Sequence, residues 1–79
     1  MIKAFVLIRI TPGYEVLVKD KLKDFDEVKE INMLYGEWDL IINIESEDLK
    51  QLKEFIIKKI RNIKGVVETS TLICADYYE

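Results

Sequence analysis

The order of apolar and polar positions along the chain predicts four β-strands and two helices. Residues Ile2 to Ile10 are apolar at almost every position, which is typical of a central strand with both faces covered. Period-two alternation predicts three more strands, and apolar residues spaced three and four apart predict the helices. The expected strands span Ile2 to Ile10, Val28 to Tyr35, Trp38 to Ile44 and Val66 to Ala75, and the helices follow Thr11-Pro12-Gly13 and Ser46.

Capping and turn residues predict where these elements begin and end. Ser46 is expected to be the N-cap of the second helix, because a serine hydroxyl can accept a hydrogen bond from the first turn. One apolar helical face continues from Leu49 to Ile63, and Gly65 is expected to close the helix directly afterwards. Gly36 supplies the positive φ that a tight hairpin between the second and third strands needs.

The elements follow the order βαββαβ, two similar halves joined by the hairpin at Gly36. This order predicts an α+β, ferredoxin-like split βαβ fold. Right-handed crossovers place both helices on one face of a four-stranded antiparallel sheet with the strand order 4-1-3-2. The second strand mixes charge into both faces, with Val28 and Ile31 on opposite sides, and therefore suits an edge of the sheet.

The two helices cover one face of this sheet and leave the other face uncovered. Phe5, Leu7 and Ile41 place apolar side chains on that second face. A chain of 79 residues has only a thin core, so we expect a second copy to pack against this face and form a dimer. Residues 1–79, with 49% hydrophobic and 34% charged residues, fit one domain, and no DNA-binding domain is expected among them.

Charge and residue content exclude several classes of function. The chain has no histidine and one cysteine, which excludes the usual His/Cys metal sites and the Ser-His and Cys-His nucleophilic pairs. A net charge of −3 argues against direct binding of nucleic acid. The longest apolar run, residues 4–8, is too short to cross a membrane, so a cytoplasmic protein is expected.

Two places carry candidate binding chemistry. Asp39 lies in an otherwise apolar strand beside a glycine turn, where a carboxylate is costly unless a partner or a ligand meets it. A solvated aspartate at a strand end explains the same residue, and its removal is expected to cost the core little. Thr69 and Thr71 point the same way from the last strand and offer two hydroxyls, although threonine is also an ordinary strand residue.

Three segments together resemble one known family. They are Ala4-Phe5-Val6-Leu7-Ile8 leading into Thr11-Pro12-Gly13, the turn Gly36-Glu37-Trp38-Asp39-Leu40, and the run from Gly65 to Ile73 with its Thr-x-Thr pair. Over essentially all 79 residues the chain resembles the effector-sensing (RAM) domain of the leucine-responsive/asparagine-regulator (Lrp/AsnC, feast/famine) transcription regulators, without their helix-turn-helix half. Trp38 stands where tyrosine is commoner in that family.

The resemblance implies an assembly and a site. It implies a dimer formed by packed sheet faces, a ring-like assembly of dimers, and an amino-acid site where dimers meet. An aspartate there can pair an α-ammonium, free N–H groups near a glycine can hold an α-carboxylate, and hydroxyls can complete the polar shell. No catalytic residue, metal or cofactor is implied. The ligand-binding residues implied are Gly36, Glu37, Trp38, Asp39, Thr69 and Thr71.

The sequence therefore leaves three hypotheses of function. The first is an amino-acid-binding module, not an enzyme, that self-assembles and modulates transcription through co-assembly with full-length regulators of the family, without touching DNA or membranes. The second is a small dimeric enzyme of the cofactor-free oxygenase type, which shares this fold pattern. The third is an oligomerisation module without a ligand. Thermal shift against free amino acids separates the first hypothesis from the others.

Overall fold

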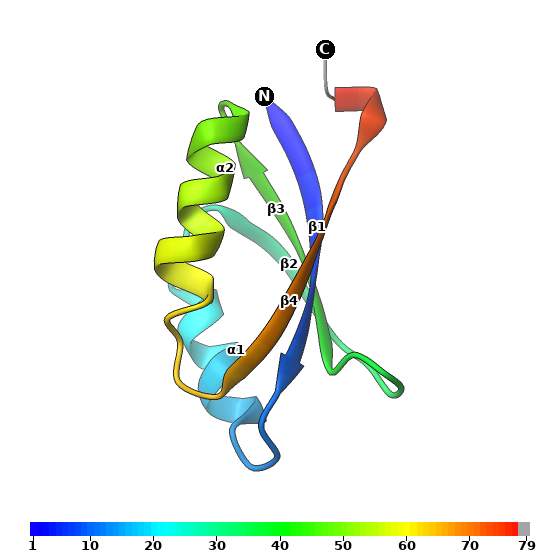
Figure 1. Ribbon diagram of the computed structural model, residues 1–79, viewed down its shortest axis with the longest axis vertical. Coiled ribbons are helices and arrows are strands. Elements are labelled where there is room, and N and C mark those ends of the chain that lie inside the picture. Colours follow the sequence, from blue (N-terminus) through cyan, green and yellow to red (C-terminus); the bar gives the residue numbers. More distant parts are fainter. Residues whose placement is uncertain (78–79) are drawn as a thin grey trace.

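An antiparallel sheet with both helices on one face forms the architecture (Figure 1). The computed structural model describes residues 1–77. The strand order β2-β3-β1-β4 confirms the predicted order and the ferredoxin-like fold. The elements are β1 (Ile2–Ile10), α1 (Glu15–Lys23), β2 (Val28–Met33), β3 (Leu40–Ser46), α2 (Leu49–Phe55), a π-helical turn η1 (Ile56–Ile60), β4 (Val66–Ile73) and a 3-10 turn η2 (Ala75–Tyr77).

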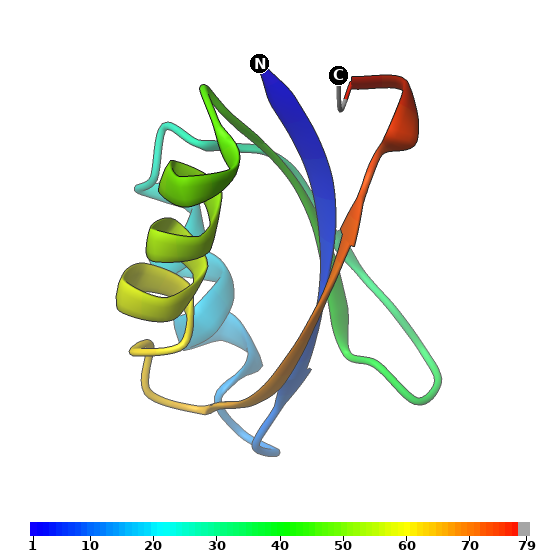
Figure 2. The same cartoon turned by 45° about the horizontal axis from the view of Figure 1, so that its top comes forward.

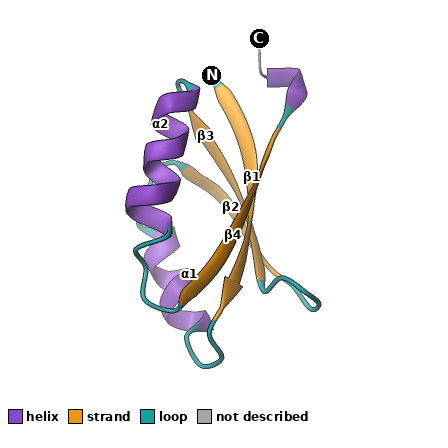
Figure 3. Ribbon diagram, in the orientation of Figure 1, coloured by secondary structure: helices purple, strands orange, loops and turns teal. Residues whose placement is uncertain are grey.

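The core lies between the helices and the inner face of the sheet. Every second residue of β1 is buried, and Ala4, Val6 and Ile8 have no exposed surface. β3 alternates in the same way and pairs with β1, so Leu40 and Ile42 continue this buried layer. Figure 3 shows the two layers, helices on one side and strands on the other. We call the sheet face without helices the open face.

A β-bulge in the edge strand β2 changes which residues face the core. The pairing of β2 with β3 shifts between Val28 and Glu30, so Val28 stands opposite Ile44 and Ile31 stands opposite Ile42. Both Val28 and Ile31 therefore pack against the core. The expectation that these two residues lie on opposite faces is wrong, because it assumed an unbroken alternation.

The second helix begins and ends at residues other than those expected. Its N-cap is Asp48, which accepts a hydrogen bond from the Gln51 backbone N–H at 2.8 Å, whereas Ser46 is the last residue of β3. The helix ends in η1, where the Arg61 N–H donates to the Ile56 oxygen at 2.9 Å. Gly65 therefore lies beyond the helix and does not close it.

Gly65 instead holds the two halves of the chain close together. Its φ is +101°, and its carbonyl accepts a hydrogen bond from the Thr11 N–H at 2.8 Å. A Cβ on Gly65 would lie 2.5 Å from the Cβ of Tyr14. Only glycine fits this position, where the loop before α1 meets the loop before β4.

The connection between β2 and β3 is longer than the tight hairpin that was expected. β2 ends at Met33 instead of Tyr35, and β3 begins at Leu40 instead of Trp38, which leaves a hairpin loop of residues 34–39. Figure 2 shows this loop leaning toward the open face. At the other end of the molecule β4 stops at Ile73, two residues before the expected end, and Tyr78 and Glu79 of the chain's tail lie outside the described residues.

Candidate functional site

Arg9 joins the hairpin loop to β4 on the open face. Its Nε donates to the Glu37 backbone oxygen at 3.2 Å, its Nη2 lies 3.5 Å from Glu37 Oε1, and its Nη1 pairs with Glu68 Oε1. Its guanidinium carbon lies 4.6 Å from the centroid of the Trp38 ring, within cation–π range. A planar guanidinium suits this arrangement because it donates in several directions at once. One side chain thus orients Glu37 and Trp38 relative to β4.

Asp39 is held at the end of the hairpin loop by three hydrogen bonds. Its Oδ2 accepts from the Ile10 N–H at 2.7 Å, its backbone N–H donates to the Ile8 oxygen at 3.0 Å, and its carbonyl accepts from the Leu34 N–H at 2.9 Å. Within residues 1–77 its Oδ1 receives no hydrogen bond. The expectation that removing this carboxylate costs little is therefore wrong, because Ile10 would lose its acceptor.

A hollow of about 500 Å³ opens beside Asp39. Glu15, Met33, Leu34 and Tyr35 complete its lining, so it combines two carboxylates with apolar side chains. Nothing lies within 4 Å of the place that a Cβ on Gly36 would occupy, which leaves the loop backbone open to an approaching molecule. The size is within the usual range for small-molecule sites, and the carboxylates suit a positively charged group.

Thr69 and Thr71 lie on the other face of the sheet. In the β1–β4 ladder Thr69 stands opposite Ile8 and Thr71 opposite Val6, two residues of the helix-covered face. Glu68, the neighbour of Thr69, stands opposite Arg9 on the open face. One chain therefore brings Glu37 and Trp38 close to β4 but does not bring them into one pocket with the two threonine hydroxyls.

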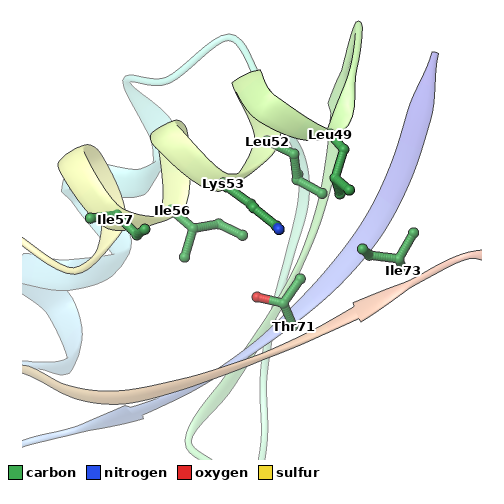
Figure 4. A pocket seen from close by; sticks show the side chains of 7 residues that line it. All are labelled: Leu49, Leu52, Lys53, Ile56, Ile57, Thr71 and Ile73. Carbon is green, nitrogen blue, oxygen red and sulfur yellow. The ribbon is translucent and has the colours of Figure 1, made fainter.

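Thr71 lines a second, more apolar hollow of about 340 Å³ between α2 and β4, which we call the α2–β4 groove. Figure 4 shows Lys53 extending from α2 into this groove and Thr71 rising into it from β4. Apart from these two polar side chains the lining is apolar. It consists of Leu49, Leu52, Ile56, Ile57 and Ile73.

Three residues that line these hollows or contact the predicted site residues were not themselves predicted from the sequence. They are Arg9, Glu15 and Lys53, of which Arg9 contacts Glu37 and Trp38, whereas Glu15 and Lys53 line the hollows. The sequence carried a signal for two of them, since Arg9 interrupts an apolar strand and Lys53 interrupts the apolar line from Leu49 to Ile57. Glu15 is one of several acidic residues at helix starts and carried none.

The described part of the chain contains neither a cluster of metal ligands nor a membrane-spanning helix. Among residues 1–77 no three His, Cys, Asp or Glu side chains are grouped so that they could hold a metal ion. No helix in the same range is long and apolar enough to cross a membrane.

The fold, with a hollow beside Asp39 and a groove between α2 and β4, is that of a small α+β domain. The model of the Lrp/AsnC ligand binding domain matches residues 3–78. The chain therefore belongs to the Lrp/AsnC ligand-binding domain family, which confirms the resemblance seen in the sequence. Members of that family are ligand-binding domains of transcription regulators, and the family is not an enzyme family.

Similar proteins include regulators about twice as long as this chain and a protein of nearly the same length. An uncharacterised HTH-type transcriptional regulator of Pyrococcus furiosus is 32% identical over 73 residues, which are 89% of this chain and 49% of the relative. The crystal structure of a hypothetical protein, PHS023, from Pyrococcus horikoshii has 43% identity and a TM-score of 0.88 over 94% of this chain and 89% of that one. AsnC of E. coli has 25% identity and a TM-score of 0.89 over 94% of this chain and 50% of its own. The chain thus spans about half the length of the curated relatives that it matches.

Proposed function

We propose that this chain binds a free amino acid as an effector and assembles with copies of itself. The observation that carries the proposal is the state of Asp39, with one carboxylate oxygen anchored by Ile10 and the other unpartnered beside a hollow. Such a carboxylate suits an α-ammonium group, and the open backbone at Gly36 suits an α-carboxylate. The proposed ligand-binding residues are Gly36, Glu37, Trp38, Asp39, Thr69 and Thr71.

Asp39 and Thr71 line two separate hollows, so we infer that the complete site requires more than one copy. Asp39 opens onto the hollow beside the hairpin loop, whereas Thr71 faces the α2–β4 groove. No residue lines both hollows within one chain. We infer that the hairpin loop of one copy meets the Thr-x-Thr strand of another where two dimers touch.

The dimer itself is proposed to form through the open face. Phe5, Leu7 and Ile41 are only half-buried there, because no helix in the described residues covers them. Asn43 lies on the same face, and its buried Oδ1 has no hydrogen-bond partner in residues 1–77. A second open face would bury the apolar side chains and can supply a donor to Asn43.

A more distant protein of the same fold supports the class of ligand. A transcriptional regulator of Neisseria meningitidis, crystallised as a complex with L-Met, shares the fold with a TM-score of 0.81 and 17% identity. An amino acid bound by that regulator favours an amino acid as the effector proposed here.

We propose that this domain affects transcription by contacting regulator proteins and not by contacting DNA. The relatives of about twice this length are HTH-type regulators, whose matching half shares this fold family. Two related domains can therefore pack in a mixed assembly and change the regulator's response to its effector. A net charge of −3 gives the domain no electrostatic attraction to the DNA backbone.

A panel of free amino acids, screened by thermal shift and followed by calorimetric titration, tests the proposal. Asp39→Asn keeps an acceptor for Ile10 but removes the charge, so the affinity of the best hit should fall roughly tenfold or more. Asp48→Asn is the matched control, because it also exchanges a carboxylate for an amide while keeping its N-cap acceptor. A panel without any hit would favour the ligand-free oligomerisation module, and equal affinities in both variants would remove Asp39 from the site.

A further inference from the structure

We propose that the α2–β4 groove binds the hydrocarbon tail of a small aliphatic carboxylate, and that Lys53 binds the carboxylate group. The proposal deepens the proposed function, on which it rests in part, since it assigns an aliphatic side chain to the effector and makes Lys53 of one copy, together with the Gly36 backbone of another, the partners of its one carboxylate. It adds Lys53 and the apolar wall formed by α2 and η1 to the proposed ligand-binding residues.

The groove has an apolar floor with two polar groups. Residues four apart on an α-helix lie above one another, so Leu49 and Lys53 form one line along α2, and Ile57 of η1 extends the wall beyond it. Leu52 and Ile56 form the neighbouring line, and Ile73 faces them from β4. Thr71 is the second polar side chain (Figure 4). A mostly apolar hollow with few polar groups is typical of small-molecule sites.

The apolar side chains of the groove retain surface that a ligand could cover. Ile57 is 56% exposed and Ile73 is 39% exposed, although both line the same groove as the core residue Leu52, which is 1% exposed. The hollow of about 340 Å³ is near the lower end of the range for ligand sites. It therefore fits a branched aliphatic chain better than a nucleotide or a peptide.

Lys53 gives the groove its charge preference. No ion pair of Lys53 exists within residues 1–77, and the groove that it shares contains no carboxylate. Its methylene groups can lie against the apolar wall while the ammonium stays at the mouth. A carboxylate at that mouth would gain a charge-assisted hydrogen bond from Lys53 and a further one from the Thr71 hydroxyl.

The π-helical turn supports a binding role for this side of α2. Ile56, the first residue of η1, accepts the hydrogen bond from Arg61 five residues later, and Ile56 and Ile57 of this turn line the groove. Such turns are rare, and they are frequent at functional sites because they widen a helix locally and redirect its side chains. Here the widened turn forms one end of the groove wall.

Titration of the full chain with 4-methylpentanoate and with leucine tests the proposal. 4-Methylpentanoate has the carbon skeleton of leucine without its amino group, so it probes the groove independently of Asp39. We expect saturable binding of both probes and a roughly tenfold to hundredfold loss of affinity in Lys53→Met, which keeps the stem but removes the charge. Lys58→Met is the matched control, because Lys58 lies on the same helical segment but lines a different hollow.

A second variant separates a loss of binding from a loss of folding. Ile57→Glu places a carboxylate in the groove at a mostly exposed position, so the far-ultraviolet circular dichroism should stay unchanged while carboxylate binding is lost. Equal affinities of the wild type and Lys53→Met for both probes, or no saturable binding of either, would overturn the proposal. If leucine binding depends on Asp39 but not on Lys53, amino-acid sensing stands and the groove proposal falls. If 4-methylpentanoate binds through Lys53 and no amino acid binds, the groove proposal stands and the amino-acid-sensing proposal falls.

Discussion

The two faces of the sheet are built from the same strands but have opposite characters. On β1, Ile8 points to the helices and has no exposed surface, whereas its neighbour Leu7 points to the open face and is half-buried. All buried residues in the described part of the chain are apolar, and they lie between the sheet and the helices. The open face instead combines apolar side chains with the ion pairs of Arg9 and the amide of Asn43.

This difference separates the source of stability from the source of recognition. A closed apolar layer stabilises the fold in proportion to the area that it removes from water and offers no directional contact to a ligand. Polar groups on the open face and at its rim are directional but contribute less to folding. The covered face is therefore expected to control the free energy of unfolding, and the open face and rims to control association and binding.

The largest loss of stability is expected on the covered face. Ile8→Ala removes a fully buried side chain and leaves a cavity, so the free energy of unfolding should fall by about 2–5 kcal/mol. Ile57→Ala, at a residue of η1 that is 56% exposed, is the control and should change the free energy of unfolding by less than about 0.5 kcal/mol. Urea unfolding at one fixed protein concentration checks both values, since association adds to apparent stability. Similar losses in the two variants would contradict the division of roles.

A smaller loss of stability is expected from a change where the hairpin loop meets β1. Asp39→Ala leaves the partly buried Ile10 N–H without its acceptor and should lower the free energy of unfolding by about 1–3 kcal/mol. Asp39→Asn keeps an acceptor at the same place and should stay within about 0.5 kcal/mol of the wild type. The same urea titration measures both. If Asn destabilises the fold as much as Ala, the charge of Asp39 and not its hydrogen bond holds the loop.

Arg9→Met should lower the free energy of unfolding by at most about 1 kcal/mol, because the ion pairs of Arg9 with Glu37 and Glu68 are largely exposed. Trp38 is the only tryptophan, so its fluorescence reports directly on the departure of the guanidinium from the ring. We expect a shifted emission maximum in Arg9→Met and an unchanged one in Arg61→Met. An unchanged spectrum in both variants would mean that Arg9 does not orient the loop.

The fold could be predicted from the sequence because its signals are local or periodic. The nearly continuous apolar run from Ile2 to Ile10 and the alternation along Trp38 to Ile44 identified the central strands, and the βαββαβ order then predicted the topology. The misplaced N-cap also had a local signal that was overlooked. Asp48 is followed three residues later by Gln51, the spacing of a capping box, whereas Ser46 is not followed by such a residue.

The rest of the structure depends on contacts between distant residues. The bulge that turns both Val28 and Ile31 to the core depends on how β2 pairs with β3, which the alternation of β2 alone does not contain. The link through Arg9 joins residues 28 and 59 positions away in the sequence. The sequence named Asp39 and Thr71 as ligand residues, but the separation of their two hollows follows only from the strand register.

The smallest effect on the single chain, and the largest on its association, is expected for Leu7→Asp. Leu7 stands between Ile41 and Ser70 on the open face, so a carboxylate there would be buried against a second copy without a partner. Val16→Asp is the control, because Val16 is 72% exposed and belongs to α1, which lies on the helix-covered side of the sheet (Figure 1). Light scattering should give the single-chain mass of 9.3 kDa for Leu7→Asp and a dimer or larger for the wild type and Val16→Asp, with the same circular dichroism for all three. If Leu7→Asp unfolds, the single chain also needs its open face to fold, and if it still associates, the copies meet elsewhere.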